Sequence, residues 1–130
     1  MAKNTTTQGI DFEKEEAQAQ AQGLVMQMQA YQQQQQALAA QKQQIEVSLA
    51  EVESAIETLK KTSEEMVYRA IGPIMVRKKK EDVEKDLAEL VETAKIRLVT
   101  VKRQEEKVRE KIREITEKIT PLLKKAGFEE

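Results

Sequence analysis

The sequence predicts a mainly α-helical chain, in which two long helices form an antiparallel coiled coil and are joined by one β-hairpin. Apolar residues recur in steps of three and four through both halves of the chain, as in a heptad coiled coil. Two short apolar runs flank a Gly-Pro pair between these halves. Charged residues make up 35% of the chain and aromatic residues only 3%, so a large globular core is not expected.

The whole chain of 130 residues is predicted to form a single domain. We expect residues 1–14 to be flexible, a first helix over 15–62, a hairpin over 66–78, a second helix over 81–120 and a C-terminal tail over 121–130.

The first predicted helix is rich in glutamine, which supplies thirteen of the 27 residues from Gln18 to Gln44. Such a composition is also found in disordered low-complexity tracts. A helix is favoured because the a/d pattern continues through the segment and glutamine is a fair helix former. The a/d positions are Leu24, Met28, Tyr31, Gln35, Leu38, Lys42, Ile45, Leu49, Val52, Ile56 and Leu59.

The second predicted helix begins with Glu81 and Asp82, whose charges suit a helix N-terminus. Pro121 is expected to end or kink it near Thr120. An extra step of four around Leu90 predicts a local change in supercoiling. The a/d positions are Val83, Leu87, Leu90, Ala94, Leu98, Val101, Glu105, Val108, Ile112, Ile115, Ile119 and Leu122.

Folding the chain at the Gly-Pro pair sets the two a/d series against each other from Leu59–Leu87 to Leu24–Leu122. In this register Lys42 falls opposite Glu105, the one charged residue of each series. Polar a/d residues commonly set register, so we expect these two side chains to pair. The alternative is that each extends separately into solvent.

Gly72-Pro73 suits a type II′ hairpin turn, because Gly supplies the positive φ and Pro the negative one. The turn sets the cross-strand pairs Ile71–Ile74, Ala70–Met75, Arg69–Val76 and Tyr68–Arg77. One face then carries Val67, Ile71, Ile74 and Val76, and the other carries Met66, Tyr68, Ala70 and Met75.

A lone two-stranded hairpin is marginally stable in water, and open apolar edges invite pairing with another chain. We therefore predict that hairpins of several chains join into a sheet or barrel. The alternative is that the hairpin folds back onto its own helix ends. The residues expected to mediate assembly are Val67, Tyr68, Ile71, Ile74, Met75 and Val76.

The order of helix, VYRAIG–PIMVRKKKE hairpin and helix resembles the β-type subunit of archaeal prefoldin over nearly the whole chain. The resemblance includes the Gln-rich first helix and the KRQEEK stretch at Lys102–Lys107. Pro73 departs from the pattern, because a polar turn residue is expected there.

The resemblance implies an ATP-independent chaperone of the archaeal cytoplasm. Such prefoldins are hexamers of two α-type and four β-type subunits, whose hairpins form an inter-subunit β-barrel. Non-native client proteins are held at the tips of the coiled coils and passed to a group II chaperonin.

Clients are expected to bind at the end of the coil opposite the hairpin, where fraying would expose apolar side chains. The candidates are Leu24, Val25, Met26, Met28, Ile119, Leu122, Leu123 and Phe128, with Ile10 and Phe12 as further ones. The alternative for Leu24, Met28, Ile119 and Leu122 is an ordinary place in the a/d core.

No enzymatic activity, cofactor or metal is predicted. The chain has no His or Cys, no phosphate-binding glycine loop, and carboxylates only on helix faces expected to be exposed. The basic run at 77–80 is followed directly by acidic residues, and the net charge is −1, so neither nucleic acid nor a membrane is an expected partner.

No apolar leader or membrane-length run is present, so a cytoplasmic location is expected. The competing function is a structural coiled-coil scaffold or tether without chaperone activity. The hairpin and the antiparallel register argue against a tether, because a tether requires neither.

Overall fold

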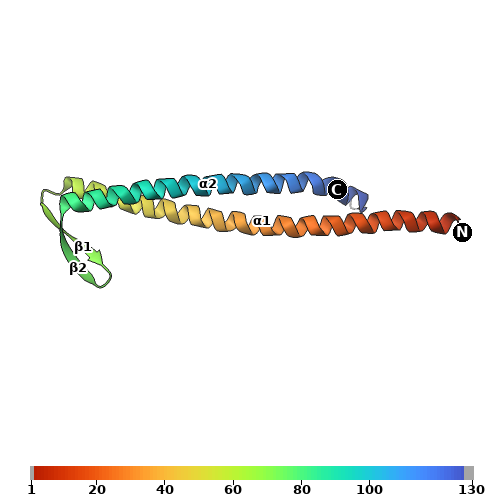
Figure 1. Ribbon diagram of the computed structural model, residues 1–130, viewed down its shortest axis with the longest axis horizontal. Coiled ribbons are helices and arrows are strands. Elements are labelled where there is room, and N and C mark those ends of the chain that lie inside the picture. The colour runs from red at the N-terminus through yellow and green to blue at the C-terminus, as the bar shows by residue number, and fades with distance from the viewer. Residues whose placement is uncertain (1, 128–130) are drawn as a thin grey trace. The chain divides into compact units, whose positions relative to one another are not determined.

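The computed structural model describes residues 2–127 of the chain, with side chains from residue 12 onward. Two helices, α1 (Ala2–Lys61) and α2 (Lys80–Lys125), flank two strands, β1 (Met66–Ile71) and β2 (Ile74–Lys79) (Figure 1). The predicted fold class is confirmed in its order of elements. The chain divides into two compact units, each with a segment of α1 and a segment of α2: unit 1 comprises residues 1–38 and 104–130, and unit 2 comprises residues 39–103.

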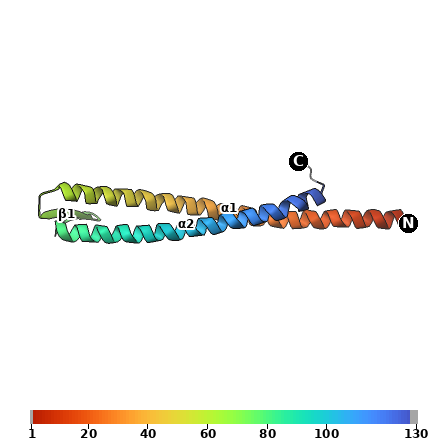
Figure 2. The same cartoon turned by 90° about the horizontal axis from the view of Figure 1, so that it is seen from above.

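Within unit 2, the end of α1 and the start of α2 lie side by side and antiparallel (Figures 1 and 2). Their contact is a narrow line of side chains at the predicted a/d spacing. Ile45, Val83 and Val101 are buried. The remaining positions of this line are half-buried: Leu49, Val52, Ile56 and Leu59 on α1, and Leu87, Val91, Ala94 and Leu98 on α2.

One a/d assignment in α2 was wrong. Leu90 is 46% exposed, and the neighbouring Val91 is half-buried instead. The extra step of four therefore comes earlier, because Val83, Leu87 and Val91 succeed one another at spacings of four. A step of four from Leu87 leads to Val91, which lies on the stripe of α2 that faces α1. A step of three leads to Leu90, which lies at the edge of that stripe.

Within unit 1, the same kind of line joins α1 to the end of α2. Six side chains are buried, and three of them are alanines beyond the predicted a/d series: Ala17, Ala21, Val108, Ile115, Ile119 and Ala126. Ala17 and Ala21 continue the steps of four and three ahead of Leu24. The sequence signal for this extension was therefore present, but it was carried by alanine rather than by large apolar residues.

Both helices extend beyond their predicted bounds. Helix α1 begins at Ala2 rather than at residue 15. Extension of an existing helix requires no new nucleation, because each added residue contributes one hydrogen bond to a turn that is already formed.

Helix α2 continues through Pro121 to Lys125 rather than ending at Thr120. Proline removes one backbone donor, but the residues after it are held against α1: Leu122 and Leu123 are half-buried, and Ala126 is 6% exposed. Gly127, with a φ of 91°, then follows the end of the helix.

The hairpin has the predicted register. Its Cα partners include Ile71–Ile74, Ala70–Met75, Arg69–Val76 and Tyr68–Arg77. Gly72 has a φ of 57°, and among residues 2–127 every residue with a positive φ is a glycine, so Pro73 keeps its negative φ as a type II′ turn requires. Strand β2 leads directly into α2, where the Lys80 N–H donates to the Glu65 carbonyl over 2.7 Å.

Candidate functional site

The first candidate surface is the hairpin, which projects from the helix pair of unit 2 (Figure 1). The register places Tyr68 and Met75 on the same face of the sheet, and each is 66% exposed. Ile71 and Ile74 pair beside the turn and are 47% and 58% exposed. Four of the six predicted assembly residues are therefore accessible as a group of large apolar side chains.

The other two predicted assembly residues, Val67 and Val76, are half-buried. They share a face with Arg69, whose Nη1 donates to Asp86 Oδ2 of α2 over 3.2 Å. Arg69 thus links this face of the hairpin to α2, while the opposite face and the turn stay open.

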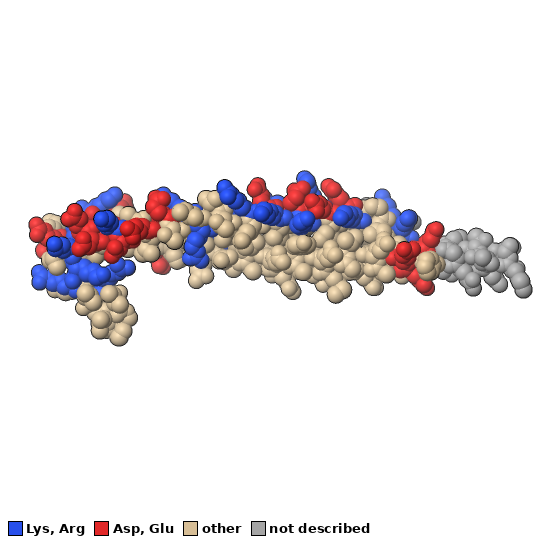
Figure 3. Space-filling view, viewed as in Figure 1, with Lys and Arg blue, Asp and Glu red and all other residues tan. Residues whose placement is uncertain are grey.

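The basic run at the base of the hairpin is partly engaged within the chain. Lys80 Nζ donates to the Thr62 carbonyl over 2.6 Å and lies 3.7 Å from Glu84 Oε1. The hydrogen bond to Thr62 joins the two helix ends that carry the hairpin, whereas the contact with Glu84 lies within α2. Figure 3 shows the lysines and arginines gathered where the hairpin leaves the helices.

The second candidate surface is a groove in unit 1, here called the terminal groove, with a volume of about 560 Å³. Successive turns of α1 supply most of its lining, and α2 supplies one residue. The lining residues are Gln18, Ala21, Gln22, Val25, Met26, Gln29 and Leu123. Val25 is 40% exposed and Met26 is 71% exposed. Three of the predicted client-binding residues, Val25, Met26 and Leu123, thus line one surface feature.

The other predicted client-binding residues lie elsewhere. Leu24, Met28 and Leu122 are half-buried in the a/d line, and Ile119 is only 8% exposed. Ile119 therefore occupies an ordinary place in the a/d core, which was the alternative given for it. Of the further candidates, Phe12 is 65% exposed. Phe128 and the side chain of Ile10 lie outside the described residues.

A second groove in unit 1, with a volume of about 470 Å³, was not predicted. It is lined by Tyr31, Gln34, Ala37, Leu38, Gln104, Lys107, Val108 and Lys111. The sequence hint was the small Ala37 next to the a/d residue Leu38, which leaves space on that flank.

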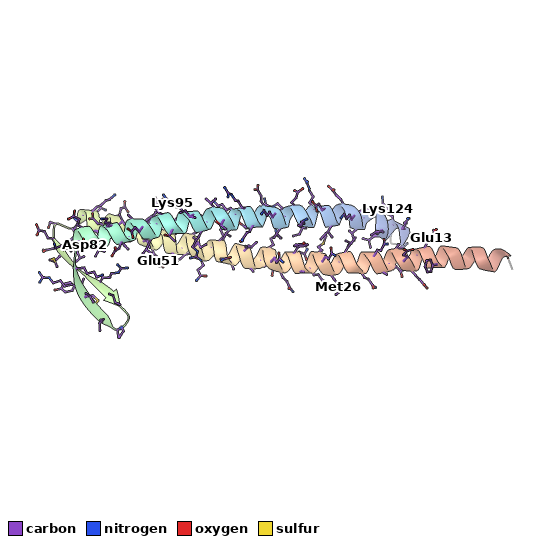
Figure 4. All side chains as sticks on the ribbon, in the orientation of Figure 1. Glu13, Met26, Glu51, Asp82, Lys95 and Lys124 are labelled. Carbon is purple, nitrogen blue, oxygen red and sulfur yellow. The ribbon has the colours of Figure 1, made fainter. Side chains whose placement is uncertain are left out.

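The two helices of unit 1 differ in surface charge. Residues 17–38 of α1 contain no Asp, Glu, Lys or Arg, whereas α2 carries many residues of both signs between 104 and 125. Figure 3 shows this α1 flank without charge and the α2 flank with many lysines, arginines and acids. Met26 and Lys124 point away from the helix pair on opposite sides (Figure 4).

Over the described residues, no group of three or more His, Cys, Asp or Glu side chains is placed to hold a metal ion. Neither helix, over its described part, carries an apolar stretch long enough to cross a membrane.

Comparison with known proteins decides the family. The family described as "Prefoldin subunit" matches residues 22–126, which is most of the chain. The chain belongs to the prefoldin subunit family. Prefoldins are a family of chaperone subunits, and membership implies assembly with other prefoldin subunits.

The similar proteins are prefoldin β subunits of archaea. The chain is 48% identical to "Prefoldin subunit beta" of Archaeoglobus fulgidus over 81 residues, which cover 62% of this chain and 70% of that protein. It is 39% identical to the protein of the same name from Pyrococcus furiosus over 82 residues, with the same coverage.

A solved prefoldin structure has the same architecture. The crystal structure of the prefoldin β subunit from Thermococcus strain KS-1 matches with a TM-score of 0.74 and 33% identity, over 80% of this chain and 92% of that chain. The resemblance drawn from the hairpin motif is thereby confirmed. The tether alternative receives no support, because the matching family is one of chaperone subunits.

Proposed function

We propose that this prefoldin subunit is an ATP-independent holdase, which captures non-native proteins at the coiled-coil tips. The observation that carries the proposal is the terminal groove, where Val25, Met26 and Leu123 present apolar surface to solvent. Exposed apolar clusters on a water-facing surface usually mark binding sites. Burial of apolar surface is favourable by about 25 cal/mol per Å², so capture by such a groove requires no nucleotide.

The groove suits clients of varied sequence. Methionine is unbranched and polarizable, and it adapts to side chains of different shape. One such groove gives weak binding, but several subunits in one assembly act together on a single unfolded chain. The resulting avidity can exceed the affinity of any single groove by orders of magnitude.

We further propose that the chain forms a hexamer of four β-type subunits, of which it is one, with two α-type subunits. The hairpins join into a β-barrel through their open edges, and Tyr68, Ile71, Ile74 and Met75 become buried between subunits. This accounts for a group of apolar side chains that would otherwise promote aggregation. The barrel holds several grooves in one particle, which the avidity argument requires.

The captured client is then passed to a group II chaperonin in the cytoplasm. Neither a nucleic acid nor a membrane takes part in this cycle. Weak individual contacts favour the transfer, because each groove can release its segment while the others still hold the client.

Light scattering tests capture. A chemically denatured test protein is diluted into buffer without ATP, either alone or with this chain assembled with its α-type partner. The native mass of the assembly is verified beforehand. We expect aggregation to be suppressed in proportion to the assembly added. Undiminished aggregation in the presence of a verified hexamer would rule out the holdase function.

A further inference from the structure

We propose that the terminal groove selects uncharged apolar segments of its clients, and that its glutamines Gln18, Gln22 and Gln29 bind the client backbone. This inference rests on the proposed holdase function and specifies which part of a non-native protein the groove takes.

The placement of the glutamines is the first argument. Gln18, Gln22, Val25 and Gln29 follow at spacings of four, three and four, so they form one line along α1. Leu123 of α2 lines the same groove. Apolar side chains are thus flanked by amide groups along the length of the groove.

Electrostatics gives the second argument. Among residues 12–127, whose side chains the structure describes, no Asp, Glu, Lys or Arg lines the terminal groove, although such residues make up 35% of the chain. Lys124, next to Leu123 in sequence, points to the side opposite Met26 (Figure 4). Lys14 lies one turn before Gln18, and its ammonium group is next to Gly127. A Cβ atom built on Gly127 would be 3.9 Å from Lys14 Nζ. A charged client residue in the groove would lose water without gaining a partner of opposite charge.

The chemistry of the amide gives the third argument. A glutamine side chain both donates and accepts hydrogen bonds, and so does every non-proline peptide unit. Non-native segments carry unpaired backbone groups that are costly to desolvate on an apolar surface. Gln18, Gln22 and Gln29 can pair with those groups whatever the client sequence is, so selection depends on the lack of charge rather than on a motif.

The second groove of unit 1 provides an internal contrast. Lys107 and Lys111 line it beside Tyr31 and Leu38. Lys111 lies 3.6 Å from Glu114 Oε2, so one of these two cations already has an acidic neighbour. The terminal groove, by contrast, is lined by no charged side chain among the described residues.

Fluorescence anisotropy with three labelled peptides tests the inference, using the verified assembly. All three share one apolar core, flanked by two Asn, two Asp or two Lys. We expect the Asn peptide to bind tightest and with little dependence on salt. The Asp and Lys peptides should each bind about tenfold more weakly. A tenfold change in Kd corresponds to about 1.4 kcal/mol of binding free energy, which is less than the cost of desolvating a charge.

The double variant Gln22→Glu/Gln29→Glu then places charge in the groove without changing helix propensity much. It should bind the Lys peptide better than the Asp peptide, whereas wild type binds them equally. Gln36→Glu is the matched control, because Gln36 is exposed on the same helix and lines neither groove of unit 1; it should behave as wild type.

The possible outcomes separate this inference from the holdase function. Failure to bind any peptide, together with unsuppressed aggregation, would refute the holdase function itself. Suppressed aggregation with a wild-type preference for either charged peptide would overturn only the selection of uncharged segments. An unchanged peptide order in Gln22→Glu/Gln29→Glu would show that the peptides do not occupy the terminal groove.

Discussion

The effect of a glycine on stability depends on its backbone conformation, as Gly72 and Gly23 show. Gly72 has a φ of 57° in the hairpin turn, a conformation that L-residues adopt at a cost. Gly23 lies in the regular part of α1, where glycine is a poor helix former. A methyl group added at either position would have no atom within 4 Å, so steric contact decides neither substitution.

Gly72→Ala should therefore destabilise the protein by about 1–2 kcal/mol through backbone strain alone. Gly23→Ala should stabilise it by about 0.5–1 kcal/mol, because alanine loses less backbone entropy in a helix. Guanidinium unfolding of both variants, followed by circular dichroism, measures the difference. A neutral or stabilising Gly72→Ala would contradict the type II′ turn.

The candidate site was partly predictable at the residue scale. The sequence indicated apolar side chains near residues 24–28 and 119–123, because they lie at the end of the two a/d series. Its a/d pattern separated Ile119, which is 8% exposed, from Val25, which lies off the series and is 40% exposed, but it could not tell whether fraying would expose Ile119. That difference depends on helix rotation, and a shift of one position along an α-helix turns a side chain by more than a quarter of a turn.

At the scale of elements, the hairpin was the most predictable part. The Gly-Pro pair fixed the turn type, and the turn type fixed all four predicted cross-strand pairs. The helices were less predictable at their ends. Pro121 lies within α2 because the packing of Leu122 and Ala126 outweighs the lost hydrogen bond, and that packing is a tertiary effect.

Tertiary packing also explains why Val91, rather than the predicted Leu90, is half-buried against α1. Both residues are apolar and adjacent, so hydrophobicity alone cannot place the extra step of four. The burial of Val91 depends on which side of α2 the chain presents to α1 after it leaves β2.

The hairpin face yields the prediction at this scale. The double variant Tyr68→Ser/Met75→Ser removes two side chains that are each 66% exposed on one face of the sheet. Since exposed side chains contribute little within one chain, the helices should fold normally while assembly weakens. Native mass spectrometry of the mixture with the α-type partner should then show free subunits in place of the hexamer.

The matched control is Ile96→Ser/Val99→Ser on α2, whose side chains are 66% and 50% exposed in the same unit. It should retain the wild-type mass. A hexamer that forms equally well with both double variants would argue against assembly through the hairpin.

At the scale of the whole molecule, two tasks are assigned to two different units. In the proposed function, the hairpin in unit 2 joins subunits, and the terminal groove in unit 1 holds clients. Each task depends on exposed apolar side chains that contribute little to the stability of the single chain. Substitutions in the groove should therefore leave assembly unaffected, whereas substitutions on the hairpin should also weaken capture, because separate subunits lose avidity.

The most direct test of this account is light scattering of a denatured test protein with assemblies that carry Val25→Ser/Met26→Ser. Burial of two such side chains contributes about 1–3 kcal/mol, so half-suppression of aggregation should require about tenfold more of this assembly than of wild type. The hexamer mass should be unchanged, and Ile96→Ser/Val99→Ser should suppress aggregation as wild type does. Full suppression by the groove variant, at the wild-type concentration, would contradict the assignment of client capture to the terminal groove.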